Sequence, residues 1–546
     1  MRRADGLALG FGLLLLHLLL TVPNRLDAIQ PAAFIRLPIE LPLILLALWL
    51  APLAWRPWLA RMVGFLAAVV LAIKLADMGA YAALNRPFSL LLDLHLAAAS
   101  WHLLSGAIGT AATVATALLA LGLVLAVAWA IAATLSRLGR VLPAAPATLS
   151  GAPSRRAATA LALALVVFAL SVGVAQTQVL TADTSRLVRD HGRFLNVSLQ
   201  DLRVFREQAA IDPFQEVPAT TLLADLRGRD VLLLFVESYG RSALEDLRYA
   251  PTILATLDRF DATLAAGGFH VRSGWVTAPM VGGQSWLAHA SILSGLWIDN
   301  QRRNHSLMLS DRRTLVHDFN AAGWETVAVM PAITMAWPEV AFFEYDRVYA
   351  AADLGYRGEP FNWVTMPDQF TLKAMHRLEL DRAPRGPLFV KSALISSHAP
   401  WTPIPPVLAW EDIGDGAIFT PYALSGDPPH VVWRDHDRVR AQYLKAVDYS
   451  LTVLESFVER FVDDDALVII LGDHQPSPLI TGPGASFDVP MHVLSRDAGL
   501  IEAIEAWGWT PSMRPEPKAP VWRMDAFRER FLGAFTPSDV ARLSAL

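Results

Sequence analysis

Residues 466–479 read ALVIILGDHQPSPL, a run of apolar residues that ends in Gly472, Asp473 and His474. A short apolar run without polar interruptions is typical of a strand buried on both faces of a sheet. This strand is followed at once by a carboxylate and an imidazole. Such a pair is either part of a polar loop or the edge of a functional site, and the rest of the sequence has to decide between the two.

Other apolar runs of similar length follow residue 229 and alternate with helical patterns. They span residues 230–238, 325–331, 387–396 and 489–495, and 441–461 is one of the helical patterns. Alternation of buried strands with helices predicts a three-layer α/β domain whose sheet is largely parallel. In such folds ligands bind at the carboxyl ends of the strands.

The residues at these strand ends carry functional groups. Glu237 ends the first strand, His398 follows the third, and Asp473 and His474 end the fourth. The stretch GGQSWLAHASILSGL (282–296) predicts a glycine-rich turn and a helix that Gly295 can close.

Ser285 stands in the first turn of that helix. Its hydroxyl there faces unpaired backbone N–H groups and the positive end of the helix dipole, which favours alkoxide and phosphate anions. The alternative is that Ser285 only caps the helix, as serine often does.

Four of these side chains form an oxygen-rich set with one imidazole, which suits a divalent cation such as Mn²⁺ or Zn²⁺, with Mg²⁺ as a further option. The metal would activate the serine and polarise a phosphoryl oxygen. His398 could protonate the leaving group. The predicted ligands are Glu237, Ser285, Asp473 and His474.

The composition points to a membrane part. Hydrophobic residues make up 53% of the 546 residues and charged residues only 18%, and the mean hydropathy is +0.37. A net charge of -5 gives no basic surface for nucleic acid, so that class of partner is excluded. With no cysteine, disulfides and thiolate metal sites are excluded too.

Five apolar stretches are long enough to cross a bilayer, which takes about 20 helical residues. They predict a transmembrane domain (1–176), a helical linker (177–220) and a catalytic domain (221–546) outside the cytoplasm. Within the third span, Lys74 and Asp77 lie on one helical face and are expected to form a structural ion pair, with a functional role in a lipid path as the alternative. Residues 86–104 are expected to lie along the outer membrane boundary. The spans are 6–23, 38–55, 62–84, 106–134 and 157–175.

The orientation follows from the arginines of the short loops, because positive residues are retained in the cytoplasm. With the N-terminus inside, the inner segments hold Arg2, Arg3, Arg56, Arg61, Arg137, Arg140, Arg155 and Arg156, and the outer ones before residue 105 hold Arg25, Arg36 and Arg86. We therefore expect a multi-pass protein of the cytoplasmic membrane.

Taken together, these motifs resemble the alkaline phosphatase/sulfatase superfamily, and in particular its membrane-anchored branch of lipoteichoic acid synthases, phosphoglycerol transferases and lipid A phosphoethanolamine transferases. SSHAPW (396–401) resembles the family's Ser-x-His-x-Pro-aromatic motif, and YLKAVDYSL (443–451) followed by GDH resembles the helix and strand that end the domain. The resemblance covers nearly the whole chain.

This resemblance implies that Ser285 takes a head-group phosphate, phosphoglycerol or phosphoethanolamine, from a membrane phospholipid and passes it to an envelope glycan or lipid. The alternative is a sulfatase-like phosphodiesterase or sulfate-ester hydrolase with water as acceptor, although residues 285–289 lack the Pro and Arg of the sulfatase pattern. The chain also departs from the synthases, which usually have Thr as nucleophile and Trp-x-Arg where this chain has Trp337-Pro338-Glu339. An ammonium group recognised by Glu339 and a solvated Glu339 both remain open.

Weaker candidates are more simply explained as structural residues. His289 lies four residues after Ser285 and is expected to be a core histidine. The other weaker candidates for metal, substrate or lipid contacts, for which a structural role is the simpler expectation, are Arg302, Arg303, Trp363, Trp401, Trp433, His436, Asp437 and His492.

Overall fold

The computed structural model describes residues 3–89, 93, 101, 104–105, 109–143 and 180–537. The chain divides into two compact units, with a boundary near residue 200. The first unit comprises Met1–Ala82, Arg86–Ser105 and Gly109–Gln200, and the second comprises Ala83–Asn85, Gly106–Ile108 and Asp201–Leu546.

The first unit is built from apolar helices. Two of them, α4 and α6, are long and apolar enough to cross a membrane, whereas Gly6–Thr21 and Glu40–Leu50 are apolar but shorter. The fifth expected span (157–175) and most of the segment 86–104 lie outside the described residues, so five spans remain a prediction. The helices are α1 (Arg3–Thr21), α2 (Pro31–Ile35), α3 (Glu40–Leu50), α4 (Arg56–Leu84), α6 (Thr110–Val141) and α9 (Asp183–Ala209), and a short parallel pair joins β1 (Leu37–Pro38) to β2 (Leu180–Thr181).

The expected ion pair between Lys74 and Asp77 is wrong. The Lys74 ammonium donates to the carbonyls of Leu19, Leu20 and Val22 at 2.9, 3.3 and 2.7 Å. The last carbonyls of a helix have no intrahelical donor, so the end of α1 offers the ammonium three acceptors. Asp77 instead accepts from Asn24, the Phe88 N–H and His191.

The second unit contains one eight-stranded sheet with strand order β10-β4-β9-β8-β3-β7-β5-β6. The sheet is mixed, because β9 runs antiparallel to both β4 and β8 while the other pairs are parallel. All five predicted strands are present, and the sequence analysis missed β4, β6 and β10. The strands are β3 (Val231–Val236), β4 (His270–Thr277), β5 (Glu325–Met330), β6 (Arg347–Ala350), β7 (Leu388–Leu394), β8 (Leu467–Gly472), β9 (Asp488–Ser495) and β10 (Val521–Arg523).

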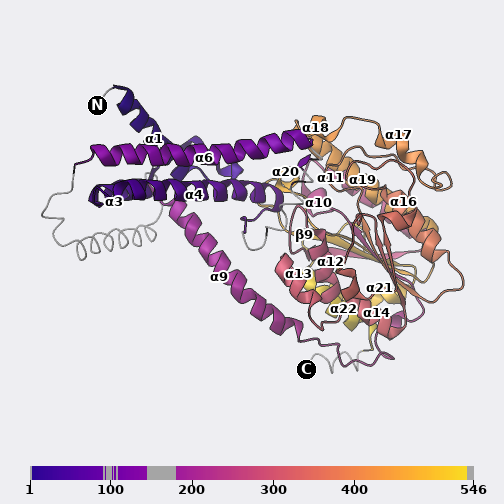
Figure 1. Cartoon of the computed structure of the whole chain (residues 1–546). Helices are drawn as coiled ribbons and strands as arrows, with labels where there is room; N and C mark the ends of the chain where they lie inside the picture. Colours follow the sequence, from indigo (N-terminus) through magenta and orange to yellow (C-terminus); the bar gives the residue numbers. More distant parts are fainter. Residues whose placement is uncertain are drawn as a thin grey trace. The chain divides into compact units, whose positions relative to one another are not determined.

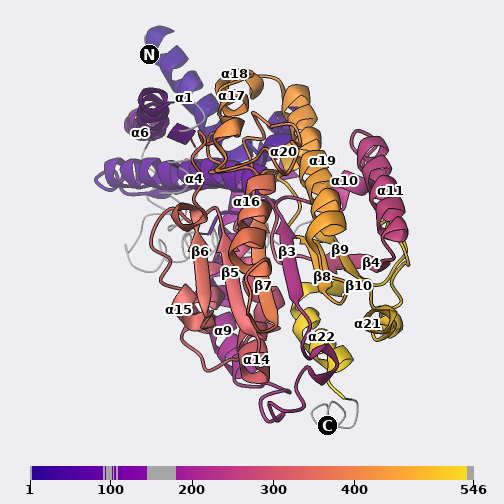
Figure 2. The same cartoon turned by 90° about the vertical axis from the view of Figure 1, so that its right-hand side faces the viewer.

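Helices cover both faces of this sheet (Figures 1 and 2), which confirms the predicted three layers. The longer helices are α11 (Ala250–Ala266), α12 (Ser285–Ser294), α13 (Gln301–Met308), α14 (Leu315–Ala322), α16 (Asp368–Met375), α19 (His436–Phe461) and α22 (Phe527–Phe535). The short ones are α10 (Ser242–Glu245), α15 (Val340–Phe343), α17 (Thr420–Ala423), α18 (Pro429–Val432), α20 (Pro478–Thr481) and α21 (Ala498–Glu502).

The central strand β3 explains why its sequence is apolar at every position. Leu232, Leu234 and Val236 join a core cluster with α11, α16 and α19. The alternate residues Val231, Leu233 and Phe235 join a second cluster with α12, α14 and α22. Since successive side chains of a strand point to opposite faces, a strand covered on both sides needs apolar residues throughout.

Candidate metal and nucleophile site

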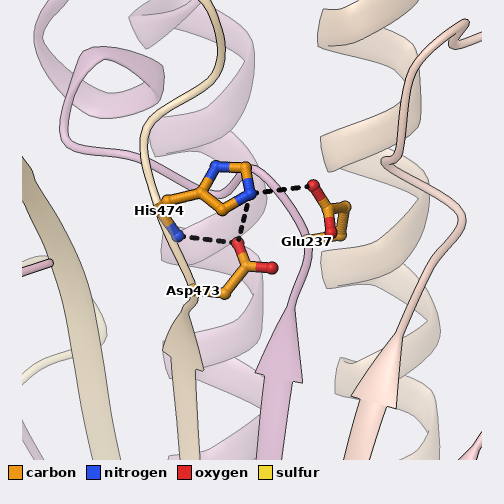
Figure 3. A group of neighbouring side chains, drawn as sticks. All are labelled: Glu237, Asp473 and His474. Carbon is orange, nitrogen blue, oxygen red and sulfur yellow. Dashed lines mark hydrogen bonds and ion pairs between the residues drawn. The ribbon is translucent and has the colours of Figure 1, made fainter. Parts of the chain in front are cut away.

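The site begins where two neighbouring strands end. β3 and β8 pair in parallel with Val236 opposite Gly472. The residues that follow, Glu237 and Asp473, therefore leave the sheet side by side, and His474 comes directly after (Figure 3). Because this register is set by the apolar residues of both strands, the core of the sheet fixes the spacing of the polar groups.

The three side chains converge on one another. One ligand atom from each of Glu237, Asp473 and His474 lies within 4.8 Å of the other two. Their residues are only 6%, 2% and 1% exposed. The imidazole Nε2 of His474 lies 3.3 Å from Glu237 Oε1 and 3.9 Å from Asp473 Oδ1.

Ser285 is brought to this cluster by a sharp turn. Gly282, Gly283 and Gln284 all have positive φ angles, 77°, 147° and 67°, and α12 begins at Ser285. A non-glycine residue such as Gln284 adopts this conformation only at a cost, and such strain is common at functional sites.

The Ser285 hydroxyl faces the cluster. It donates to Glu237 Oε2 at 3.0 Å and lies 3.3 Å from His474 Nε2, and α12 shows no side-chain capping bond at its first turn. The structure thus brings all four predicted ligands together, while their roles remain predictions.

Backbone groups orient two of the ligands. Asp473 Oδ1 accepts from the Ser238 and His474 N–H groups at 2.8 and 2.7 Å, which leaves Oδ2 for another partner. His474 Nδ1 lies 2.8 Å from the Gln475 carbonyl, so we assign the ring proton to Nδ1. Nε2 points toward the cluster, and when it loses its proton its lone pair is placed as in metal-binding histidines.

The two buried carboxyl groups of the cluster favour the binding of a cation. Burial, and next the negative charge of Glu237, raise the pKa of Asp473 to about 8. Burial also opposes ionisation of Glu237, but the charges of His474 and His398 outweigh it and hold its pKa well below the usual range. Burial lowers the pKa of His474, yet the neighbouring carboxylates raise it to about 9. A divalent cation would compensate both carboxylates, so the donor set fits the predicted metal.

The charge of His398 lowers the pKa of Glu237. Within the described part of the chain, the two residues share no hydrogen bond. The ring of His398 stacks on Trp363, with centroids 4.0 Å apart and planes at 19°. Trp363 is 47% exposed. His398 is therefore placed beside the cluster and next to solvent, where it can meet a substrate.

Sequence reasoning missed Lys391, a buried lysine in the centre of β7. Its Nζ lies 3.1 Å from His289 Nδ1 and 2.9 Å from Met330 Sδ. Burial lowers the pKa of Lys391 to about 7, with the charge of Asp473 acting against this shift. The signal was visible in the sequence, because Lys391 interrupts the apolar run 387–396. His289 is buried and packs on Phe235, which agrees with the expectation of a core histidine.

Most of the weaker candidates have structural partners. Arg303 pairs with Asp201, and His492 is buried between Tyr239 and Ser273. Asp437 contacts Arg440 on α19, and Trp401 is buried and stacks on Trp433. Glu339 immediately precedes α15, and its role stays a prediction.

Part of the second unit matches a known protein family. Residues 229–494 match the Sulfatase family model. A search of curated proteins found no match to the chain.

Three of the solved structures to which the chain is similar are the following. The lipoteichoic acid synthase LtaP from Listeria monocytogenes is 12% identical, with a TM-score of 0.38 over 62% of this chain and 78% of that one. The C-terminal periplasmic domain of EptC from Escherichia coli is 14% identical, with a TM-score of 0.37 over 58% and 82%. The phosphoglycerol transferase GacH from Streptococcus pyogenes, in complex with sn-glycerol-1-phosphate, is 11% identical, with a TM-score of 0.38 over 63% and 82%.

Proposed function

We propose that this chain is a metal-dependent phosphotransferase acting on a membrane phospholipid, and the match of residues 229–494 to the Sulfatase family model supports this proposal. Ser285 takes the head-group phosphate and passes it to a hydroxyl of an envelope glycan or lipid. The observation that carries the proposal is the position of the Ser285 hydroxyl, 3.0 Å from Glu237 and 3.3 Å from His474.

Glu237, Ser285, Asp473 and His474 would hold one divalent cation, Mn²⁺ or Zn²⁺ with Mg²⁺ as a further option. When bound, the cation lowers the pKa of the serine hydroxyl and stabilises the developing charge on the phosphoryl oxygens. Glu237 accepts the hydrogen bond of the hydroxyl and so orients its oxygen. The α12 N-terminus adds backbone N–H groups that favour an anionic phosphate.

In the first half-reaction, the Ser285 Oγ–P bond forms and the bond from phosphorus to the diacylglycerol oxygen breaks. The serine proton is lost to the medium, and His398 donates a proton to the departing oxygen. In the second half-reaction, the bond from an acceptor oxygen to phosphorus forms and the Ser285 Oγ–P bond breaks. The proton of the acceptor hydroxyl passes to His398, and Ser285 Oγ takes a proton from the medium. Water in place of that acceptor would make the same site a phosphodiesterase.

The transferred group is either phosphoglycerol or phosphoethanolamine. Glu339 stands where the resembling synthases carry arginine, and a carboxylate there favours a group with an ammonium. We therefore prefer phosphoethanolamine.

The test is mass spectrometry of the Ser285 peptide after the full chain, loaded with Mn²⁺, is incubated with mixed phospholipids and quenched in acid. We expect the added mass of ethanolamine phosphate. Ser285→Ala should abolish the modification, and the exposed Ser425→Ala should retain it. Addition of glycerophosphate would reverse the choice of group. An unmodified Ser285 peptide, with phospholipid still hydrolysed, would refute the covalent route.

A further inference from the structure

The first unit contains a cavity of about 550 Å³ that the proposed chemistry does not use. It is lined by three segments of that unit: residues after α1, the last turns of α4 and the first turns of α9. A volume of this size lies within the range of small-molecule sites, about 300–1,000 Å³. The cavity is therefore large enough for a phospholipid head group.

The lining carries charges of both signs in balance. The lining contains three basic residues and three acidic ones together with His191: Arg36, Lys74, Arg186, Asp77, Asp183 and Asp190. A lining that balances its charges is complementary to a ligand that also carries both, rather than to a purely anionic one.

The charged side chains of the lining differ in the number of hydrogen-bond and ion-pair partners that they have among the described residues. Arg36 has no hydrogen bond or ion pair with any described residue, and Arg186 comes only within 3.9 Å of Asp183. Lys74 and Asp77, in contrast, already have three partners each. The two arginines are thus available for an anion.

Asp190 in the same lining is a carboxylate with one weak ion pair. Asp190 is 56% exposed and comes within 3.5 Å only of its neighbour Arg189. An anionic ligand without an amine would meet this carboxylate uncompensated, whereas an ammonium would pair with it. The cavity therefore offers separate places for a phosphate and an ammonium.

The position along the chain matches the depth of lipid head groups. Lys74, Asp77 and Tyr81 lie in the last third of the apolar helix α4, and α9 begins with the polar sequence Asp183, Thr184 and Ser185. In the predicted orientation, with the N-terminus inside, these segments mark the outer boundary of the membrane. Head groups of the outer leaflet lie at this level.

We propose that this cavity binds the head group of a membrane phospholipid that carries both a phosphate and an ammonium group. Arg36 and Arg186 hold the phosphate, and Asp190 holds the ammonium. The proposal does not depend on the chemistry of Ser285, and it assigns a lipid-binding site to the first unit.

The test is native mass spectrometry of the full chain in detergent, on a Ser285→Ala background so that bound lipid is not consumed. Equal amounts of phosphatidylethanolamine and phosphatidylglycerol are offered. We expect phosphatidylethanolamine to be retained about 10-fold better, the effect of one charge-assisted contact worth about 1.4 kcal/mol.

Two variants probe the two ends of the ligand. Arg36→Gln should weaken binding of both lipids, and Asp190→Asn should remove the preference for phosphatidylethanolamine. Arg61→Gln, on an exposed position of α4, and Asp225→Asn, exposed in the second unit, are the matched controls and should change neither. Each variant must elute as the same single species as the parent protein.

The outcomes separate the alternatives. Equal retention of the two lipids by the parent protein would overturn the proposal. Unchanged binding of both lipids in Arg36→Gln, or an unchanged preference for phosphatidylethanolamine in Asp190→Asn, would also overturn it. Soluble phosphoethanolamine bound as tightly as the intact lipid would also overturn it, because the site would then serve a soluble ligand. Since Ser285 is absent throughout, none of these results bears on the phosphoserine.

Discussion

The buried charges at Lys74 and Asp77 in the first unit and at Glu237 and Asp473 in the second are satisfied differently. In the first unit, Lys74 is fully occupied by helix-end carbonyls and Asp77 by an amide, a backbone N–H and a histidine. In the second unit, Glu237 and Asp473 face each other across one imidazole, and both are almost completely buried. Charges that the chain itself satisfies hold the fold together. Two carboxylates and an imidazole gathered in one buried place offer the ligand atoms that a divalent cation binds.

The largest effect should come from Glu237, which contacts both Ser285 and His474. Glu237→Gln removes the charge that a cation needs, so we expect metal affinity to fall by at least about 100-fold and turnover with it. Metal content after dialysis, measured by elemental analysis, checks this. Glu502→Gln, at an exposed position of α21, is the control and should keep its metal. A metal content equal in both variants would refute the assignment of Glu237 as a ligand.

The second effect is a pH-dependent change in stability at Asp473. The pKa of Asp473 is raised to about 8 in the folded, metal-free protein, against about 4 in an unfolded chain. Between these values the folded state holds the proton more tightly, so the contribution of Asp473 to stability falls as pH rises. Asp473→Asn removes that loss.

We expect the Tm difference, Asp473→Asn minus parent, to grow between pH 5 and pH 8 by about 5 °C in metal-free protein. The charge of Asp473 also raises the pKa values of Lys391 and His474, so the Tm difference reports Asp473 together with its effect on these two neighbours. Mn²⁺ should stabilise the parent more than the variant. A difference that stays constant with pH would contradict the raised pKa.

A smaller effect should come from the turn that presents Ser285. Gly283 has φ of 147°, and a Cβ added there would meet no atom within 4 Å. Gly283→Ala therefore tests backbone conformation alone, at a cost of about 1–3 kcal/mol. We expect kcat to fall about 10-fold while metal content stays the same, because Ser285 moves relative to intact ligands. Unchanged kcat with lowered stability would show that the turn serves only the fold.

The smallest effect on catalysis should come from the first unit. Lys74→Gln leaves carbonyls at the end of α1 with fewer donors, so the protein should lose thermal stability. Turnover of a soluble phosphodiester should change less than about 2-fold, since no chemistry is assigned to this residue. A loss of turnover as large as that of Glu237→Gln would contradict the assignment of a purely structural role to Lys74.

The sequence was informative where one physical cause sets the pattern. The apolar runs before Glu237 and Asp473 predicted buried strands, and the register of β3 on β8 then placed both carboxylates at one edge. The pair Gly282 and Gly283 predicted a turn before a helix, and α12 begins at Ser285. Local patterns sufficed because each strand and turn is specified by adjacent residues.

The sequence was less informative where the partner is distant or is the backbone. The spacing of Lys74 and Asp77 predicted an ion pair. The Lys74 ammonium instead donates to backbone carbonyls at the end of α1, and such acceptors cannot be read from a pattern of side chains. The strand β4 (His270–Thr277) contains His270, Arg272 and Ser273 and so lacks an apolar run. Lys391 interrupts the apolar run 387–396. Its contact with His289 depends on the packing of α12 against the sheet, which the sequence does not show.

The central claim is that the four donor groups surround a single cation. X-ray absorption of the Zn²⁺-loaded full chain tests it directly, because imidazole ligands give a distinct scattering signature. The account predicts one nitrogen ligand and otherwise oxygen ligands at about 2.0–2.2 Å, with the imidazole signature lost in His474→Ala. Two or more imidazoles, or a spectrum unchanged in His474→Ala, would contradict it.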